Sequence, residues 1–319
     1  MLTVSGDLAD ADGLGRTSYQ WQQSIDGTNW SDIGGATSDS VALTEAQVGK
    51  QMRIKASYTD GAGKQESIIS AETTSVANVN DAPTGTVTIS GVAEQGRVLS
   101  VANNLADIDG LGSINYQWQS SIDGTAWSSI NGACTSTFTL TEAQVGMQVR
   151  ALASYTDGHG TYETVASAAS SAVANTNDPL IGDVVVEGTA TQGLTLTARS
   201  TFSDTDGLGA VTYQWQSSSD GLNWHGINGA TAATFTLSEN QVGQQVRVIA
   251  SYVDAHGTLE GKVSTATNAV ANINDALDGT VTIEGKVAQG QTLTAGHNLE
   301  DADGLGSVTY RWESSSDGK

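Results

Sequence analysis

Alternating polar and apolar residues predict β-strands along most of the chain. Ile114, Tyr116 and Trp118 share one parity, so their side chains face the same side of a sheet. Val149, Ala151, Ala153 and Tyr155 share the apolar face of a second segment in the same way. Within residues 83–179, we expect strands over residues 86–89, 98–101, 114–119, 135–140, 148–155 and 164–173, and a return segment through Trp127 and Ile130.

Turn signals separate these segments, and helical periodicity is weak. Asp123-Gly124 is typical of a type I′ hairpin turn. Only residues 141–144 suggest a single helical turn. About seven short strands joined by turns in a unit of this length predict an all-β fold built as an antiparallel β-sandwich, with Trp118 in its core.

The same pattern returns every 97 residues. Tyr-Gln-Trp begins at Tyr19, Tyr116 and Tyr213, and Tyr-Arg-Trp begins at Tyr310. We therefore predict tandem β-sandwich repeats in an extended rod. Residues 1–82 form a partial repeat that lacks its first strand, 83–179 and 180–276 form complete repeats, and 277–319 form a truncated repeat. The chain is expected to be a segment of a longer array.

Composition narrows the range of functions. The formal net charge is −22, with 13 basic against 35 acidic residues, which argues against binding nucleic acid or anionic membranes. The single cysteine, Cys134, excludes an intramolecular disulfide. No apolar run is long enough to insert into a membrane. An acidic chain without disulfides needs another source of rigidity, for which divalent cations are the natural candidates.

Carboxylates recur at three places in each repeat. In the second repeat these are the pair Asp107 and Asp109, Asp157 after a strand, and Asp81 in the linker. Ca²⁺ takes six to eight oxygen ligands, more than one such loop supplies, so several loops have to converge. Asp-Gly pairs also form turns without any metal, and this alternative stays open. An EF-hand is excluded because Trp21 stands where the loop starting at Asp10 would need a bidentate Glu.

The motifs YQWQSSIDGTAWSSINGA, TLTEAQVGMQVRALASYTDGHG and VANVNDAPTG resemble the Ig-like or cadherin-like extender repeats of giant bacterial RTX-type adhesins. The resemblance covers the whole chain. It implies an extracellular, cell-surface shaft without enzymatic activity, secreted by a type I system, that supports cell adhesion and biofilm formation. Its partners would be the neighbouring repeats of the same polypeptide, and the adhesive target stays open. The RTX nonapeptides themselves are absent from this sequence.

The resemblance to cadherins further implies Ca²⁺ sites at the junctions between repeats. At the first junction, the matching residues are Glu45, Asn78, Asn80, Asp81, Asp107, Asp109 and Asp157. At the second, they are Glu142, Asn175, Asn177, Asp178, Asp204, Asp206 and Asp254. At the third, they are Glu239, Asn272, Asn274, Asp275, Asp301 and Asp303.

Three departures from the cadherin pattern lower the expected number of ions to one or two per junction. Asn78 and its counterparts replace the first linker Asp. Tyr155 replaces the Ala of the Ala-x-Asp motif, which leaves the role of Asp157 open. The early Glu94 becomes Thr191 and Ala288 in later repeats.

Two other patterns suggest weaker hypotheses. Trp30, Trp127 and Trp224 recur after each hairpin, so an array of carbohydrate-binding surfaces is the alternative function, and exposure of these rings would discriminate it. Glu66, Glu163 and Glu260 recur after the Asp-containing turn, either beside a metal or as surface charges. His159 aligns with Ala62, so no required role is expected for this histidine.

Overall fold

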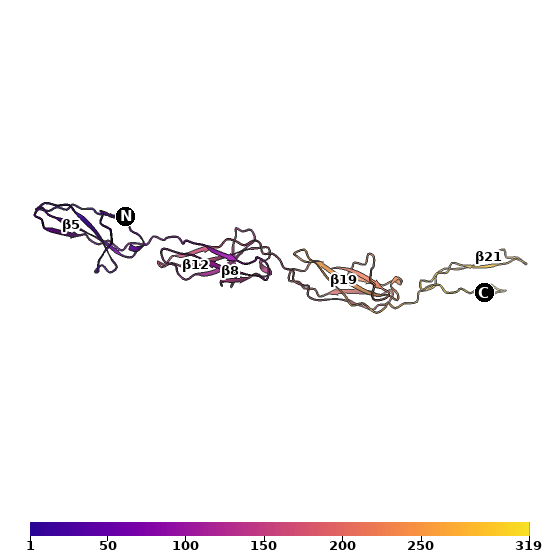
Figure 1. The fold of residues 1–319 in the computed structure, drawn as a ribbon. Coiled ribbons are helices and arrows are strands. Elements are labelled where there is room, and N and C mark those ends of the chain that lie inside the picture. The colour runs from indigo at the N-terminus through magenta and orange to yellow at the C-terminus, as the bar shows by residue number, and fades with distance from the viewer. Residues whose placement is uncertain (319) are drawn as a thin grey trace. The chain divides into compact units, whose positions relative to one another are not determined.

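A computed structural model describes residues 1–318, which consist of β-strands, loops and three single-turn 3₁₀ helices (Figure 1). All strand pairs within its sheets are antiparallel, so the predicted fold class is confirmed. The chain divides into two compact units, 1–175 and 176–319, which are described separately. Among the described residues, no helix is long and apolar enough to cross a membrane.

The first unit contains one complete sandwich. One sheet has the order β10-β9-β12-β13 and the other the order β11-β8-β7. Their bounds are β7 Val87–Ser90, β8 Val98–Asn103, β9 Asn115–Ser121, β10 Ser128–Ser129, β11 Thr137–Thr139, β12 Gln148–Thr156 and β13 Tyr162–Ala166. The 3₁₀ turn η2 spans Glu142–Gln144, as the sequence predicted.

Residues 1–82 of this unit form a less complete pair of sheets. The larger sheet has the order β3-β2-β5-β6, and β1 pairs only with β4. The bounds are β1 Leu2–Thr3, β2 Ser18–Ser24, β3 Ser31–Asp32, β4 Ser40–Val41, η1 Glu45–Gln47, β5 Gln51–Thr59 and β6 Gln65–Ile69.

The second unit repeats the complete sandwich and ends in a hairpin. Its sheets have the orders β14-β15-β18 and β17-β16-β19-β20, and β21 pairs with β22. The bounds are β14 Val184–Glu187, β15 Thr195–Ser200, β16 Thr212–Ser218, β17 His225–Gly226, β18 Thr234–Thr236, η3 Glu239–Gln241, β19 Gln245–Val253, β20 Leu259–Val263, β21 Val281–Glu284 and β22 Thr294–His297.

The core of each sandwich is centred on the tryptophan that strand parity selected. Trp118 is fully buried, and its ring lies 5.7 Å from that of Phe138 on the opposite sheet. Its indole N–H donates to the carbonyl oxygen of Thr135 at 2.9 Å, which satisfies the one polar atom of the ring. The expected place of Trp118 in the core is confirmed, and Trp215, its counterpart one 97-residue period later, occupies the same place in the second unit.

Two local expectations are corrected. Only glycines have positive φ among the described residues, so Asp123 does not adopt the left-handed conformation that a type I′ turn requires. The Asp123 carboxylate instead accepts the N–H groups of Thr125 and Ala126 and closes a longer loop. The last predicted strand, 164–173, is regular only up to the end of β13, Tyr162–Ala166. Beyond it the backbone N–H groups of Ser167 and Ser170 still donate to β12 carbonyl oxygens, but the N–H groups of Ala151 and Val149 donate to the hydroxyls of these two serines in place of backbone carbonyls.

The predicted repeat boundaries after residues 82, 179 and 276 stay predictions. Among residues 1–318, one buried cluster spans Val87 to Val173 and another Val184 to Val270, so each draws on a single predicted repeat.

Candidate metal centre

A close backbone approach positions the paired aspartates of the complete sandwich in the first unit. A Cβ added to Gly112 would lie 2.0 Å from the carbonyl oxygen of Thr156, so only glycine lets this loop lie against the end of β12. The loop then places Asp107 beside Tyr155, whose hydroxyl donates to Asp107 Oδ2 at 2.6 Å. The other oxygen, Asp107 Oδ1, accepts the N–H of Asp109 at 2.9 Å.

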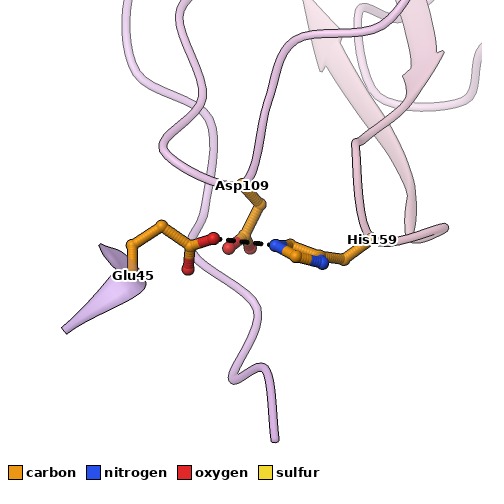
Figure 2. Close-up of side chains that lie close together, drawn as sticks. All are labelled: Glu45, Asp109 and His159. Atoms are coloured by element: carbon orange, nitrogen blue, oxygen red, sulfur yellow. Dashed lines mark hydrogen bonds and ion pairs between the residues drawn. The ribbon is translucent and has the colours of Figure 1, made fainter. Parts of the chain in front are cut away.

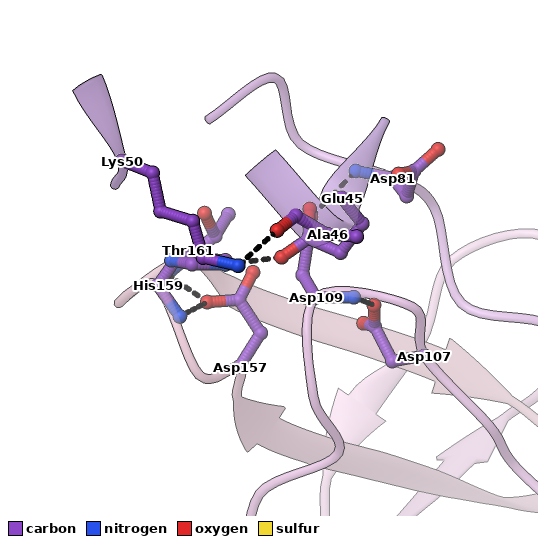
Figure 3. Close-up of polar contacts among 9 residues, drawn as sticks. All are labelled: Glu45, Ala46, Lys50, Asp81, Asp107, Asp109, Asp157, His159 and Thr161. Atoms are coloured by element: carbon purple, nitrogen blue, oxygen red, sulfur yellow. Dashed lines mark hydrogen bonds and ion pairs between the residues drawn. The ribbon is translucent and has the colours of Figure 1, made fainter. Parts of the chain in front are cut away.

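Asp109 and Asp157 are the most deeply buried carboxylates of this site, with 4% and 7% of their surfaces exposed. Asp109 Oδ2 accepts the linker N–H of Asp81 at 2.7 Å. Asp157 Oδ1 accepts the N–H groups of His159 and Thr161, each at 2.8 Å (Figure 3). The remaining oxygens, Asp109 Oδ1 and Asp157 Oδ2, are buried without a hydrogen-bond partner. A buried, unsatisfied carboxylate oxygen is costly unless a cation or a donor compensates it.

The linker adds amide groups to the same region. Asn80 Nδ2 donates to Glu163 Oε1 at 2.7 Å, and the other oxygen of Glu163 accepts the Tyr155 hydroxyl at 3.1 Å. Asn78 Oδ1 is a third buried oxygen without a partner. The linker is thereby held to the sandwich that follows it.

Glu45, from η1 in residues 1–82, completes the site. Its Oε1 lies 2.7 Å from His159 Nε2, and Glu45, Asp109 and His159 each offer one ligand atom within 4.8 Å of the others. Figure 2 shows the three side chains pointing toward one another from three separate segments. Asp107, Asp157 and Glu163 form a second group with the same spacing.

Burial, hydrogen bonds and neighbouring carboxylates shift the pKa values of three groups at this site. Burial raises the pKa of the Tyr155 hydroxyl, and its hydrogen bonds to the carboxylates of Asp107 and Glu163 raise this pKa further. Burial acts to raise the pKa of Asp157, but the N–H groups of Thr161 and His159 outweigh it, so the pKa is lowered. The hydrogen bond to Glu45 raises the pKa of His159, and the charges of Asp109 and Asp157 add to this effect.

The donor set suits a hard divalent cation. Ca²⁺ prefers carboxylate and amide oxygens at about 2.3–2.6 Å, and the buried oxygens of Asn78, Asp109 and Asp157 are of this kind. Because these oxygens lack donors from the protein, a bound cation would supply the compensation that they need. The residues of the first junction therefore fit calcium.

The second unit contains the same arrangement around its own linker. Asp178 N–H donates to Asp206 Oδ2 at 2.7 Å, and Asp206 N–H donates to Asp204 Oδ1 at 2.9 Å. Tyr252 donates to Asp204 and Glu260, while Asn177 Nδ2 donates to Glu260 at 2.9 Å. The buried oxygens without partners here are Asp206 Oδ1 and Asp254 Oδ2. Glu142 and Asn175, which the prediction groups with them, belong to the first unit.

The residues expected at the third junction also converge within the second unit. Glu239, Asp275 and Asp303 each offer an oxygen within 4.8 Å of the others. Burial raises the pKa of Glu239, and the charges of Asp303 and Asp275 raise it further. Asp275 N–H donates to Asp303 Oδ2, and Asp303 N–H to Asp301 Oδ1. Asn272 and Asn274 are exposed, and Asn274 Nδ2 donates to the carbonyl oxygen of Asp275 at 2.8 Å. Metal ligation by any predicted residue stays a prediction.

Sequence reasoning understated three residues of the first site. Tyr155, which the sequence marks only as a departure from the Ala-x-Asp motif, joins Asp107 to Glu163. Glu163 is itself 9% exposed, which decides against a plain surface charge. His159, for which no role was expected, meets Glu45. The recurrence of Glu66, Glu163 and Glu260, eight residues after each tyrosine, was the signal available in the sequence.

The tryptophans that recur after each hairpin offer little surface to a sugar. The rings of Trp30, Trp127 and Trp224 are half-buried, and an arginine guanidinium lies 4.1–4.2 Å above each ring centre. In the complete sandwich of the first unit this arginine is Arg150, which also donates to Gln119. One ring face is therefore already occupied by a cation–π contact.

A family model described as a domain of unknown function, DUF8696, matches residues 2–79 and 182–274, together more than half of the chain. A search of curated proteins found no match. Among solved structures, the chain is similar to a tetra-tandem repeat from the extending region of a large adhesion protein. That match has 15% identity over 91% of this chain and 82% of the other, with a TM-score of 0.29.

Two further structures belong to bacterial ice-binding adhesins. The first is a Ca²⁺-stabilised adhesin of an Antarctic bacterium, at 15% identity over 84% of this chain and 68% of the other, with a TM-score of 0.30. The second is a 1.5-MDa adhesin, at 14% identity over 85% and 89%, with a TM-score of 0.31. These neighbours are of the class that the sequence resemblance named. At such identities and TM-scores, the function has to be argued from the site itself.

Proposed function

The chain belongs to the DUF8696 family of domains of unknown function, and from this premise we propose that it is a structural shaft segment of a bacterial surface adhesin. In this proposal, Ca²⁺ at the junctions between repeats stiffens the shaft, which supports cell adhesion and biofilm formation outside the cell. The segment acts mechanically and has no catalytic role.

The observation that supports this proposal most strongly is the set of buried, unpartnered oxygens at the first junction. Asp109 Oδ1 and Asp157 Oδ2 come from the sandwich after the linker, and Asn78 Oδ1 comes from the linker. Glu45, from the preceding residues, is paired with His159 and offers a ligand atom within 4.8 Å of one from Asp109. A cation shared among these groups would restrict the hinge between them, because each segment would lose freedom to move away from the ion.

The resident ion would add only positive charge and fixed coordination. The chain's own residues do the positioning: Gly112 admits the aspartate loop, Tyr155 orients Asp107, and Asp81 N–H orients Asp109. Without the ion, the carboxylates around the linker repel one another, which favours a more open and mobile junction.

Calcium binding followed by isothermal titration calorimetry tests the proposal. We expect the full chain to bind Ca²⁺, and Asp109→Asn together with Asp157→Asn to remove the one or two ions of the first junction. Asp123→Asn is the matched control, because Asp123 lies in a hairpin loop where its Oδ1 accepts three donors. A chain that binds no calcium, or a double variant with unchanged stoichiometry, would refute the calcium shaft.

A further inference from the structure

We infer that the first junction also binds a transition-metal cation of the Zn²⁺ or Co²⁺ class through Glu45 Oε1, Asp109 Oδ1 and His159 Nε2. Glu45 lies on η1, Asp109 on the aspartate loop and His159 on the loop after β12, and each residue offers one ligand atom within 4.8 Å of those of the other two. The inference rests on the proposed calcium junction only in that the two cations would share Glu45 and Asp109.

The imidazole distinguishes this site from a calcium site. Ca²⁺ takes oxygen ligands almost exclusively, so His159 contributes nothing to its coordination. Imidazole nitrogen suits Zn²⁺, Co²⁺, Ni²⁺ and Cu²⁺, and one His with two carboxylates is a donor set that such ions accept. His159 Nε2 points at the two carboxylates (Figure 2), which is the orientation that a ligand needs.

A simple ion pair between His159 and Glu45 does not account for the whole arrangement. Glu45 is 30% exposed and His159 33% exposed at their side chains, so this pair by itself could remain solvated. Asp109, in contrast, is 4% exposed, and its Oδ1 has no hydrogen-bond partner. A cation bound between the three groups would compensate that oxygen, whereas the ion pair leaves it unsatisfied.

Side-chain movement has to bring the three groups to metal-ligand spacing. Ligands about 2.1 Å from a tetrahedral metal lie about 3.4 Å apart, so Glu45 Oε1 and His159 Nε2, which lie 2.7 Å apart, would separate to admit the ion. All three groups lie on loops or on a single 3₁₀ turn. The backbone of the His159 loop is already tied to Asp157 Oδ1 at 2.8 Å, which limits the entropy lost on binding.

Co²⁺ is a suitable probe because its visible absorption reports nitrogen ligation and coordination number. The full chain would be prepared with His225, His256 and His297 replaced by alanine, so that His159 is the remaining histidine. We expect one equivalent of Co²⁺ to bind with visible bands, and Zn²⁺ to displace it. His159→Ala should weaken Co²⁺ binding at least about tenfold, since loss of even an outer partner costs 10–100-fold. Alanine stands at the aligned position 62, so the loop tolerates this change.

Calcium titrations of the same samples separate the two proposals. His159→Ala should leave Ca²⁺ affinity within about twofold, because no oxygen ligand is lost. Asp109→Asn should weaken both cations, and excess Ca²⁺ should bleach the Co²⁺ bands. Absence of the bands, their survival in His159→Ala, or their indifference to Ca²⁺ in a chain that calorimetry shows to bind Ca²⁺ would overturn the shared transition-metal site. A chain that binds Co²⁺ through His159 but no Ca²⁺ would refute the calcium shaft and leave this site standing.

Discussion

At the scale of single residues, the buried carboxylate oxygens fall into two groups: those that accept a hydrogen bond from the protein and those that have no donor. Asp107 has donors on both oxygens, from Asp109 N–H and from the Tyr155 hydroxyl. Asp109 and Asp157 each keep one buried oxygen without a donor. Such oxygens are rare in folded proteins because they cost free energy, so their recurrence at Asp206 and Asp254 favours a ligand over chance.

Removing the core tryptophan tests the sandwich assignment. Trp118→Ala should lower the free energy of unfolding of its sandwich by about 3–5 kcal/mol, because the cavity left by a fully buried aromatic ring cannot collapse completely. Hydrogen exchange of β12 amides measures the loss, and β19 amides, which pack on the unchanged Trp215, serve as the control in the same molecule. A loss below about 1 kcal/mol, or an equal loss in β19, would contradict the assignment.

The hairpin aspartate gives a pH-dependent prediction. The N–H groups of Ala126 and Thr125 hold the pKa of Asp123 below its ordinary value of 3.8. A lowered folded pKa means that the stabilisation is fully present above pH 3.8 and is lost as the pH falls through the folded pKa. Carbon NMR should place the Asp123 titration midpoint below 3.8. In Asp123→Asn, the amide shifts of Thr125 and Ala126 should no longer follow that titration, and a persistent response would refute the assignment.

At the scale of elements, the acidic loops are placed by the strands that they join. The loop from Asp107 to Gly112 precedes β9, and Asp157 directly follows β12, its neighbour in the sheet. Because the two strands are antiparallel, the start of β9 and the end of β12 meet at one end of the sandwich. The N–H of Gly158 accordingly donates to the carbonyl oxygens of Asp109 and Gly110.

The glycine at this contact should tolerate no side chain. Gly112→Ala would place a Cβ 2.0 Å from Thr156 O, so the loop has to move away from β12, at a cost of about 1–3 kcal/mol. Gly306→Ala is the matched control, since Gly306 occupies the same motif position with no atom within 4 Å of its Cβ. Hydrogen exchange at the amides of 157–161 would measure the effect. Equal and negligible effects of both variants would show that the close approach is unimportant.

At the scale of the whole molecule, the prediction is that calcium sets the angle between repeats and leaves the fold of each repeat intact. The buried clusters around Trp118 and Trp215 are complete without any metal. The charge of −22 should splay the junctions when they are empty.

Small-angle scattering with and without chelator measures the effect of calcium on the extension of the chain, and circular dichroism measures its effect on the fold of the repeats. Chelation should shrink the maximum dimension while far-UV circular dichroism keeps its β-signal. Asp107→Ala with Asp109→Ala should make the first junction more flexible. With calcium present, the maximum dimension of this double variant should therefore shrink by part of the amount that chelator causes in the unaltered chain. A scattering profile indifferent to chelator, or repeats that unfold in it, would contradict the prediction.

The sequence by itself determined the features that depend on local chemistry and period. Strand parity selected Trp118 and the apolar face from Val149 to Tyr155, because side chains alternate along any strand whatever its partners. The 97-residue period located the acidic positions, since equivalent residues of a repeat occupy equivalent places. Turn type escaped prediction at Asp123, where side-chain hydrogen bonds favoured a longer loop.

Only the tertiary structure decided which of the acidic groups meet. Glu45 and His159 are 114 residues apart, and Asn80 and Glu163 are 83 apart, so no local pattern links them. The role of Tyr155 depends on a loop reaching it from 48 residues away, through a glycine contact that the sequence does not reveal. Contacts of this kind follow from strand pairing and from the burial of charge, and these are properties of the folded chain alone.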